Sequence, residues 1–168
     1  NIIDTIRFYD EVYKYFKSLN FKIKKKIKII QISTDEVYGS LKNNEKPFTE
    51  KSLIKPNNPY SASKSSIEHF LRSYYKTFGM PVIITRCSNN FGPRQKEEKF
   101  IPKCITYILK SKKIPLYGDG SQVRDWIYVT DHCKAIIKIM KSGKVGEIYN
   151  IGGSNLITNK KLIKIIFY

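Results

Sequence analysis

Residues 27–39 read Ile-Lys-Ile-Ile-Gln-Ile-Ser-Thr-Asp-Glu-Val-Tyr-Gly, an apolar run followed at once by two hydroxyl groups and two carboxylates. The run at 27–32 predicts a buried strand. Thr34, Asp35 and Glu36 then stand just past the carboxyl end of that strand, where open α/β sheets bind their ligands. Short motifs often match by chance, so the triplet taken alone favours a polar loop whose Thr and Asp cap backbone groups.

A second chemical pair lies downstream, in a segment of helical periodicity. Apolar residues recur along 60–78 on one helix face, and Gly79 is placed to end the helix. Tyr60 and Lys64 are four residues apart, so they share a face of this helix. A phenol has an ordinary pKa of about 10, and a neighbouring ammonium group lowers it. The pair could take a proton from a hydroxyl group, although the start of a surface helix after Pro59 is the simpler interpretation.

Strand and helix patterns alternate along the rest of the chain. Strands are predicted at 81–86, 114–117, 126–129 and 147–151, and helices at 2–17 and 100–111. Asp131 is predicted to cap a helix that ends near Ser142, and Thr158 to cap a last helix. Loops are predicted at 40–59 and 87–98. The alternation predicts an α/β fold with a mostly parallel sheet.

Composition excludes several classes of protein. The 168 residues, 41% of them hydrophobic, suffice for a domain with a real core. No apolar stretch has the length of a membrane span, and the first residues lack the pattern of a signal peptide. Cys87, Cys104 and Cys133 are widely spaced and form no metal-binding pattern with the two histidines. Buried thiols in a reducing cytoplasm, and no metal, are therefore expected.

The formal net charge of +17 raises the question of a nucleic-acid partner. Against this, the lysines are spread along the whole chain, and most occupy polar positions of the predicted helices. We therefore favour a compositional drift over nucleic-acid binding. An anionic small ligand would still be attracted by this field.

Further polar side chains follow the predicted strands. Asn89 and Asn90 come after the strand at 81–86, and they fit either ligand contacts or ordinary turn chemistry. Arg124 follows a glycine-rich turn and suits a phosphate, or else an ion pair with Asp125. No G-x-G-x-x-G, the fingerprint of a dinucleotide-binding turn, occurs anywhere in the sequence.

Six motifs occur in one order along almost the whole chain. They are Ser-Thr-Asp-Glu-Val-Tyr-Gly (33–39), Pro-Tyr-Ser-Ala-Ser-Lys (59–64), Arg-Cys-Ser-Asn-Asn-Phe-Gly-Pro (86–93), Pro-Leu-Tyr-Gly-Asp-Gly (115–120), Arg-Asp-Trp-Ile-Tyr-Val (124–129) and Tyr-Asn-Ile-Gly-Gly (149–153). The combination closely resembles the dTDP-glucose 4,6-dehydratases of the extended short-chain dehydrogenase/reductase family, which are NAD-dependent lyases of deoxysugar biosynthesis with a Rossmann-like fold. Thr-Asp-Glu distinguishes these dehydratases from the related epimerases.

The resemblance implies a role for each catalytic candidate. Tyr60 would take the proton of the sugar C4 hydroxyl while a hydride passes to NAD, and Lys64 would lower the Tyr60 pKa and hold the nicotinamide ribose. Thr34 would hydrogen-bond the C4 oxygen. Glu36 would then remove the C5 proton, and Asp35 would protonate the departing C6 hydroxyl. The hydride returns to C6, which gives a 4-keto-6-deoxy sugar. Adjacent carboxylates in different roles suit such an elimination.

The resemblance also implies the binding residues and partners. Asn89 would contact the diphosphate of the nucleotide sugar, and Asn90 would lie nearer the cofactor. The other positions that match the substrate pocket are Lys99, Tyr117, Arg124 and Asn150. A homodimer through the helices at 2–17 and 60–78 is expected.

The sequence also departs from the family pattern. The strand and glycine-rich turn that bind NAD in the family are absent, so we expect a partial Rossmann-like parallel sheet with flanking helices and an open edge. Residues 1–86 would be the catalytic part of the NAD-binding domain. Residues 87–168 would form a small substrate-binding region, interleaved with the first part and cut short at its end. The chain is therefore expected to be an incomplete dehydratase, inactive alone.

Three other interpretations stay open. A nucleotide-sugar epimerase or decarboxylase of the same fold would share most of the motifs. A non-catalytic remnant could retain only the dimerising helices. A nucleic-acid-binding protein ranks below both.

Overall fold

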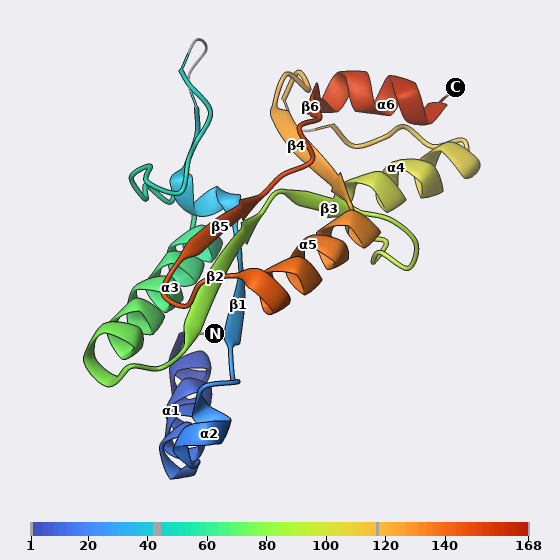
Figure 1. Ribbon diagram of the computed structural model, residues 1–168. Helices are drawn as coiled ribbons and strands as arrows, with labels where there is room; N and C mark the ends of the chain where they lie inside the picture. The colour runs from blue at the N-terminus through green and yellow to red at the C-terminus, as the bar shows by residue number, and fades with distance from the viewer. Residues whose placement is uncertain (1, 42–44, 117, 168) are drawn as a thin grey trace. The chain divides into compact units, whose positions relative to one another are not determined.

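The computed structural model describes residues 2–41, 45–116 and 118–167 (Figure 1). The chain divides into two compact units. Unit 1 comprises residues 1–87 and 136–151, and unit 2 comprises residues 88–135 and 152–168. Helix α5 (Val129–Ser142) contributes to both. The predicted α/β class is confirmed, because helices flank a parallel sheet of three strands.

Unit 1 is built on that parallel sheet. Its strands β1 (Ile29–Thr34), β2 (Val82–Cys87) and β5 (Ile148–Ile151) lie in the order β1-β2-β5. The pairing places Ser33 of β1 beside Arg86 of β2, and Arg86 beside Asn150 of β5. The carboxyl ends of the three strands therefore meet at one edge, where α/β sheets bind ligands.

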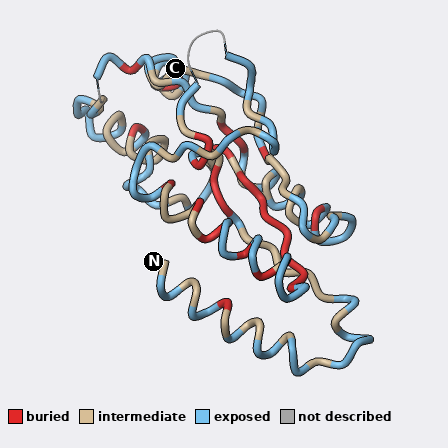
Figure 2. The backbone as a smooth tube through the Cα atoms, turned by 90° about the vertical axis from the view of Figure 1, so that its left-hand side faces the viewer, coloured by how far each residue is buried: buried red, intermediate tan, exposed pale blue. Residues whose placement is uncertain are grey.

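Helix α3 (Pro59–Phe78) packs on the sheet, and helix α1 (Ile2–Ser18) packs on α3 (Figure 1). Figure 2 shows buried residues gathered along the strands and the inner face of α3, whereas α1 is mostly exposed or half-buried. The core residues are Tyr9, Ile67, Leu71, Tyr74, Met80, Val82 and Ile84. A short helix α2 (Phe21–Lys24) leads from α1 towards β1.

Local signals set both ends of α3. The Asn58 side chain accepts a hydrogen bond from the Ser61 N–H at 2.8 Å, and Pro59 stands at the first helical position. Gly79 ends the helix in the left-handed region at φ 67°. The expected stop at Gly79 is therefore confirmed.

Replacing Gly79 with alanine is expected to destabilise the chain by about 1 kcal/mol, because a Cβ disfavours left-handed backbone. Apart from Gly79 and its two neighbours in the chain, no heavy atom lies within 4 Å of the position that this Cβ would take, so the effect is conformational rather than steric. Urea unfolding measures it. Gly79→Asn should destabilise less, since asparagine tolerates this conformation, and equal losses would contradict the explanation.

Two phenols join α1 to the rest of unit 1. Tyr9 donates to Gln31 Oε1 at 2.5 Å. Tyr74 donates to the carboxylate of Asp10, and this hydrogen bond, followed by burial and the charge of Asp10, raises the pKa of Tyr74 to about 12. The neutral phenol is therefore the form that the folded chain stabilises.

This shift predicts a loss of stability at high pH. The folded pKa lies above the ordinary value of about 10, so the contribution of Tyr74 is present below pH 10 and disappears as the pH rises to about 12. Between pH 10 and about 12, the window of this titration, we expect the urea midpoint to fall by less in Tyr74→Phe than in the unsubstituted chain. An identical fall in both would contradict the assignment.

Unit 2 contains a smaller sheet of strands β3 (Asn89–Phe91), β4 (Val123–Tyr128) and β6 (Leu156–Thr158). Strands β3 and β4 are parallel, and β4 and β6 are antiparallel. Helices α4 (Phe100–Leu109) and α6 (Asn159–Phe167) complete it. Trp126 packs between the rings of Phe91 and Phe100, at centroid distances of 6.5 and 6.3 Å. Thr158 accepts from the Lys161 N–H at 3.1 Å, so the predicted cap is confirmed.

The structure corrects three local predictions. No strand forms at 114–116, because Pro115 has no N–H to donate to a ladder; Tyr117 lies outside the described residues. The predicted loop at 87–98 contains β3. Asp131 does not cap α5, which begins at Val129; its carboxylate instead pairs with Lys134 at 3.0 Å.

Strand β5, at one border of the parallel sheet, has a covered edge. The backbone N–H of Asn150 donates to Glu50 Oε1 at 2.9 Å, so the loop before α3 supplies the acceptor that a further strand would otherwise supply. No described helix is long and apolar enough to span a bilayer.

Candidate active site

The triplet Thr34-Asp35-Glu36 lies at the end of β1. The strand runs two residues further than predicted, so Thr34 is its last residue and also caps the short 3-10 helix η1 (Asp35–Tyr38). Thr34 Oγ1 accepts from the Glu36 N–H at 3.2 Å and lies 3.4 Å from Asp35 Oδ1. The capping interpretation of Thr34 is thus correct. It also fixes the direction of both carboxylates, because they sit on the turn that Thr34 starts.

The two carboxylates differ in their surroundings. Asp35 is half-buried, whereas Glu36 is exposed. The amide of Asn58 donates to Glu36 Oε2 at 3.3 Å, while the oxygen of the same amide caps α3. One residue therefore joins the acidic turn to the start of the helix that carries Tyr60.

Tyr60 and Lys64 lie on the first turns of α3, as predicted. The Lys64 ammonium lies 5.9 Å from the centroid of the Tyr60 ring, and Tyr60 is 52% exposed. The prediction that Lys64 lowers the Tyr60 pKa is wrong in this structure. Partial burial raises the pKa of Tyr60, and the negative charges of Glu36, Cys87 and Asp35 raise it further. The phenol of Tyr60 therefore lies in the electrostatic field of both Asp35 and Glu36.

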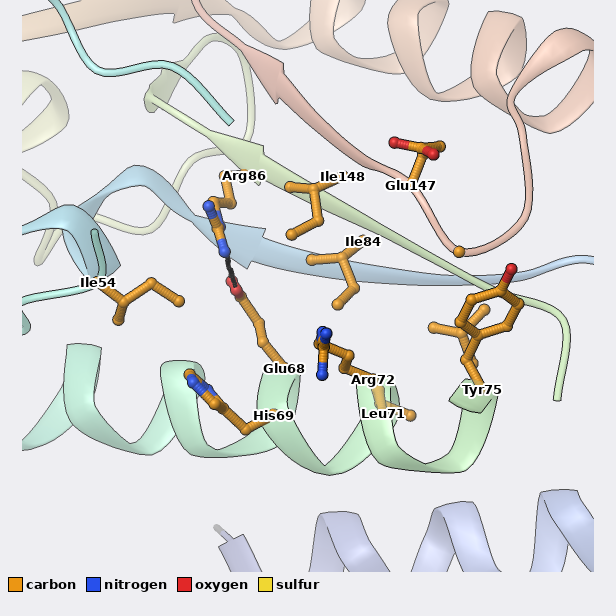
Figure 3. A pocket seen from close by; sticks show the side chains of 12 residues that line it. Ile54, Glu68, His69, Leu71, Arg72, Tyr75, Ile84, Arg86, Glu147 and Ile148 are labelled. Atoms are coloured by element: carbon orange, nitrogen blue, oxygen red, sulfur yellow. Dashed lines mark hydrogen bonds and ion pairs between the residues drawn. The ribbon is translucent and has the colours of Figure 1, made fainter. Parts of the chain in front are cut away.

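The sequence did not predict a buried polar network that links η1, α3, β2 and β5, and Figure 3 draws its Glu68–Arg86 pair. Arg86 and Glu68 are each 3% exposed, and Tyr38 is 2% exposed. Arg86 donates to Glu68 Oε2 from Nε at 3.0 Å and from Nη2 at 2.6 Å. Its Nη1 donates to the Tyr38 hydroxyl at 2.7 Å, which in turn donates to Asn150 Oδ1 at 2.7 Å.

The network keeps Arg86 charged. Burial would lower the pKa of Arg86, but the hydrogen bonds to Glu68 and Tyr38 and the charge of Glu68 outweigh it and raise the pKa. The available signal was an arginine at the end of the predicted strand at 81–86, directly after Val82, Ile83, Ile84 and Thr85, since a buried charge needs a partner. Asn150, expected to line the substrate pocket, has its side-chain oxygen engaged by Tyr38.

The remaining candidates belong to unit 2. Asn90 donates to the Ser88 carbonyl at 3.1 Å, and its own Oδ1 is buried with no partner among the described residues. Asn89 is half-buried in β3. Lys99 is the N-cap residue of α4, and its side chain makes no capping hydrogen bond. Arg124 is exposed and donates to the Val123 carbonyl at 2.8 Å.

The expected alternative of an ion pair between Arg124 and Asp125 is not what the structure has. Asp125 accepts from the backbone N–H groups of Gly153 and Asn155, each at 2.7 Å. Its carboxylate thus orders the glycine turn after β5. Arg124 stays available for an anionic ligand.

Figure 3 shows a hollow in unit 1 between α3 and the sheet. Its volume is about 120 Å³, and Leu71, Ile84 and Ile148 form apolar walls beside the Glu68–Arg86 ion pair. Pockets for small-molecule ligands usually measure about 300–1,000 Å³. The hollow is therefore too small for a nucleotide sugar, and none of the catalytic candidates lines it.

The chain matches known proteins over its whole length. The family model described as GDP-mannose 4,6 dehydratase matches residues 1–168. A dTDP-glucose 4,6-dehydratase of Xanthomonas campestris is 43% identical over 99% of this chain and 47% of its own length. The chain thus spans about half the length of the curated relatives it matches.

Two solved structures also match nearly all of this chain with about half of their own length. The crystal structure of dTDP-glucose 4,6-dehydratase from Bacillus anthracis in complex with NAD is 50% identical, with a TM-score of 0.88 over 98% of this chain and 50% of that one. A UDP-glucuronic acid 4-epimerase from Bacillus cereus, in complex with UDP-glucuronic acid and NAD, is 29% identical with a TM-score of 0.85, over 98% of this chain and 49% of that one.

Proposed function

This chain belongs to the GDP-mannose 4,6-dehydratase family, and from that premise we propose that it carries the acid–base residues of a dTDP-glucose 4,6-dehydratase. One observation supports this most: Asp35 and Glu36 follow β1 directly, and both act electrostatically on the Tyr60 phenol. An elimination needs an acid and a base on the same substrate. The related epimerase shares the fold, but an epimerisation needs no such carboxylate pair.

The residues present fit the cofactor of the family, NAD. Tyr60 and Lys64 offer a phenol and an ammonium group at the exposed start of α3, and such donors suit ribose hydroxyl groups. Asn90 Oδ1 is a buried acceptor with no described partner. When bound, NAD supplies reversible redox chemistry at the sugar. We propose Tyr60, Lys64 and Asn90 as its contacts in this chain.

The chain's own residues then perform the proton transfers. Thr34 orients the C4 oxygen, and Tyr60 accepts the proton of the C4 hydroxyl. Once C4 is a ketone, the C5 proton is acidic and Glu36 removes it. Asp35 gives a proton to the C6 oxygen, which leaves as water.

We propose that unit 2 holds the nucleotide part of the substrate. Arg124 is exposed and suits a diphosphate, with Asn89 and Lys99 as further contacts. Tyr117 and Asn150 remain candidates by family resemblance. Among the described residues no group of three His, Cys, Asp or Glu side chains could hold a metal ion, and the proposed steps use none.

A chimera tests the function. Residues 1–168 would replace the matching half of the Bacillus anthracis dehydratase, which supplies the remaining part of the site. Incubation with dTDP-glucose should give a 4-keto-6-deoxy product. The absorbance of this product in alkali measures how much has formed. Formation of a C4 epimer instead would favour the epimerase function, and no turnover by a folded chimera would overturn both.

The 168-residue chain by itself is predicted to bind NAD weakly, with a Kd above about 1 mM, corresponding to less than about 4 kcal/mol of binding free energy. The reason is that the sequence contains no G-x-G-x-x-G turn to bind the pyrophosphate. Isothermal titration calorimetry measures this affinity. Tight stoichiometric binding would contradict the prediction.

We further propose that the chain dimerises through α1 and α3. Phe8, Tyr15 and Phe70 are 61%, 67% and 44% exposed on these two helices. Large apolar side chains on adjacent helices are typical of interfaces. Sedimentation velocity at micromolar concentration would detect a dimer, and Phe8→Glu should dissociate it. A cytoplasmic location is part of the proposal. Of the thiols that were expected to be buried, Cys104 is buried, whereas Cys133 is exposed.

A further inference from the structure

Arg86 lies on β2, the middle strand of the parallel sheet, close to the carboxyl end of the strand and so to the candidate site. In the strand pairing it is flanked by Ser33, the residue before the catalytic triplet, and by Asn150. Its guanidinium binds Glu68 on one side and Tyr38 on the other. Arg86 therefore connects two segments that are distant in sequence.

Those two segments carry the proposed acid–base groups. Tyr38 ends η1, the turn that also contains Asp35 and Glu36. Glu68 lies on α3 eight residues after Tyr60, or about 12 Å along the helix axis at about 1.5 Å per residue. The Tyr38–Arg86–Glu68 chain of hydrogen bonds thus joins the acidic turn to the helix of the phenol.

The Tyr38 side chain is fixed both at its hydroxyl and at its ring. Its hydroxyl accepts from Arg86 and donates to Asn150, both at 2.7 Å. Its ring stacks on Phe48 at a centroid distance of 4.9 Å and an interplanar angle of 17°. A side chain fixed at both its ring and its hydroxyl fixes the backbone of the turn that bears it.

Stability alone does not account for this arrangement. Buried ion pairs are weak contributors to stability, because apolar side chains of similar volume often replace them without loss. A phenylalanine at position 38 would keep the stacking on Phe48 and lose only the hydroxyl. The hydroxyl is what transmits the position of Arg86 to η1.

We propose that Tyr38 is a positioning residue, whose hydrogen bonds to Arg86 and Asn150 hold the turn of Asp35 and Glu36 at a fixed distance from Tyr60. The inference rests on the proposed function, since it assigns Tyr38 a part in that reaction. It concerns geometry only: Tyr38 itself touches no substrate atom.

The first test uses the 168-residue chain and needs no activity. Tyrosines labelled with ¹³C at Cζ report the ionisation of Tyr60 by NMR, and the spectrum of Tyr60→Phe assigns its signal. Burial and the charges of Glu36, Cys87 and Asp35 raise the pKa of Tyr60. In Tyr38→Phe the turn keeps its Thr34 cap and the Asn58 contact but loses its link to Arg86. The part of the shift that comes from Glu36 and Asp35 should therefore shrink, and the pKa of Tyr60 should move part of the way towards its ordinary value.

Tyr9→Phe is the matched control. It also removes one hydroxyl from a buried tyrosine of unit 1, 8% exposed and bonded to Gln31. Among the described interactions, the Tyr9 side chain contacts neither η1 nor Arg86. Tyr9→Phe should leave the pKa of Tyr60 unchanged while lowering the urea midpoint. Equal shifts of the Tyr60 pKa in both variants would overturn the inference, because they would report general loosening.

The second test is kinetic and uses the chimera. Tyr38→Phe should lower kcat by about 10-fold to 100-fold, since a misplacement of about 1 Å can have that effect, and leave KM within about twofold. Tyr9→Phe should leave kcat nearly unchanged. If Tyr38→Phe does not fold, Arg86→Lys serves instead, because lysine keeps the charge but cannot bind Glu68 and Tyr38 together.

The outcomes separate the two proposals. A chimera with no dehydratase activity before substitution overturns the proposed function. An active chimera in which Tyr38→Phe keeps full kcat overturns the positioning role and leaves the function intact. A rise in KM with unchanged kcat would also overturn it, since Tyr38 would then affect binding rather than the reacting geometry.

Discussion

Glu68→Ala is expected to destabilise the chain by about 3–5 kcal/mol, the usual effect of removing one partner from a buried ion pair. The substitution leaves the Arg86 guanidinium 3% exposed, without the carboxylate that it binds at 2.6 and 3.0 Å. This loss is a large fraction of the stability of an ordinary domain. Urea unfolding followed by circular dichroism measures it.

Two controls separate this effect from a general sensitivity of the helices. Lys134→Ala removes one partner of the exposed ion pair with Asp131, whose side chains are 76% and 60% exposed, and should change stability little. The double substitution Glu68→Leu with Arg86→Met removes both charges and should recover most of the loss. A double variant as unstable as Glu68→Ala would contradict the electrostatic explanation.

Glu36→Gln in the chimera is expected to lower the rate of water loss by about 10²–10⁴-fold, the usual contribution of a general base. Glutamine has nearly the same shape and keeps an oxygen that can accept from Asn58, so the turn should stay in place. KM should change little, because the base acts on the reacting proton. Steady-state assays of product absorbance in alkali provide both constants.

Glu11→Gln is the control for this variant. Glu11 lies on α1, is 71% exposed and pairs only with Lys14 among the described residues. It should retain the activity of the unsubstituted chimera. Retention of full turnover by Glu36→Gln would refute its assignment as the base.

The sequence was sufficient for the elements whose signals are local. The 3.6-residue spacing, Pro59 and Gly79 placed α3 within one residue of its observed bounds. The apolar runs located β1, β2 and β5, with ends that moved by one or two residues. Strand β3 was missed because three residues with two asparagines carry no strand pattern.

What the sequence could not supply are interactions between residues far apart in the chain. Tyr38 and Asn150 are 112 positions apart, and nothing in either local pattern indicates that one donates to the other. The direction in which the pKa of Tyr60 shifts also depends on a contact between distant segments, because the charges of Glu36 and Asp35 on η1 act on α3. Helical spacing showed that Lys64 is a neighbour, but it could not show that burial and two carboxylates would prevail.

Glu50 bears on how this protein can aggregate. Its carboxylate occupies the outward N–H of Asn150, so a strand from another molecule would meet a negative charge at β5 and lose a hydrogen bond there. The other border of the same sheet is β1, where Ile32 is 47% exposed. Among the described residues no strand pairs with the outer side of β1, the side away from β2. Intermolecular sheet growth in concentrated samples should therefore proceed from β1, and a lysine at position 32 would be the change that keeps the protein soluble.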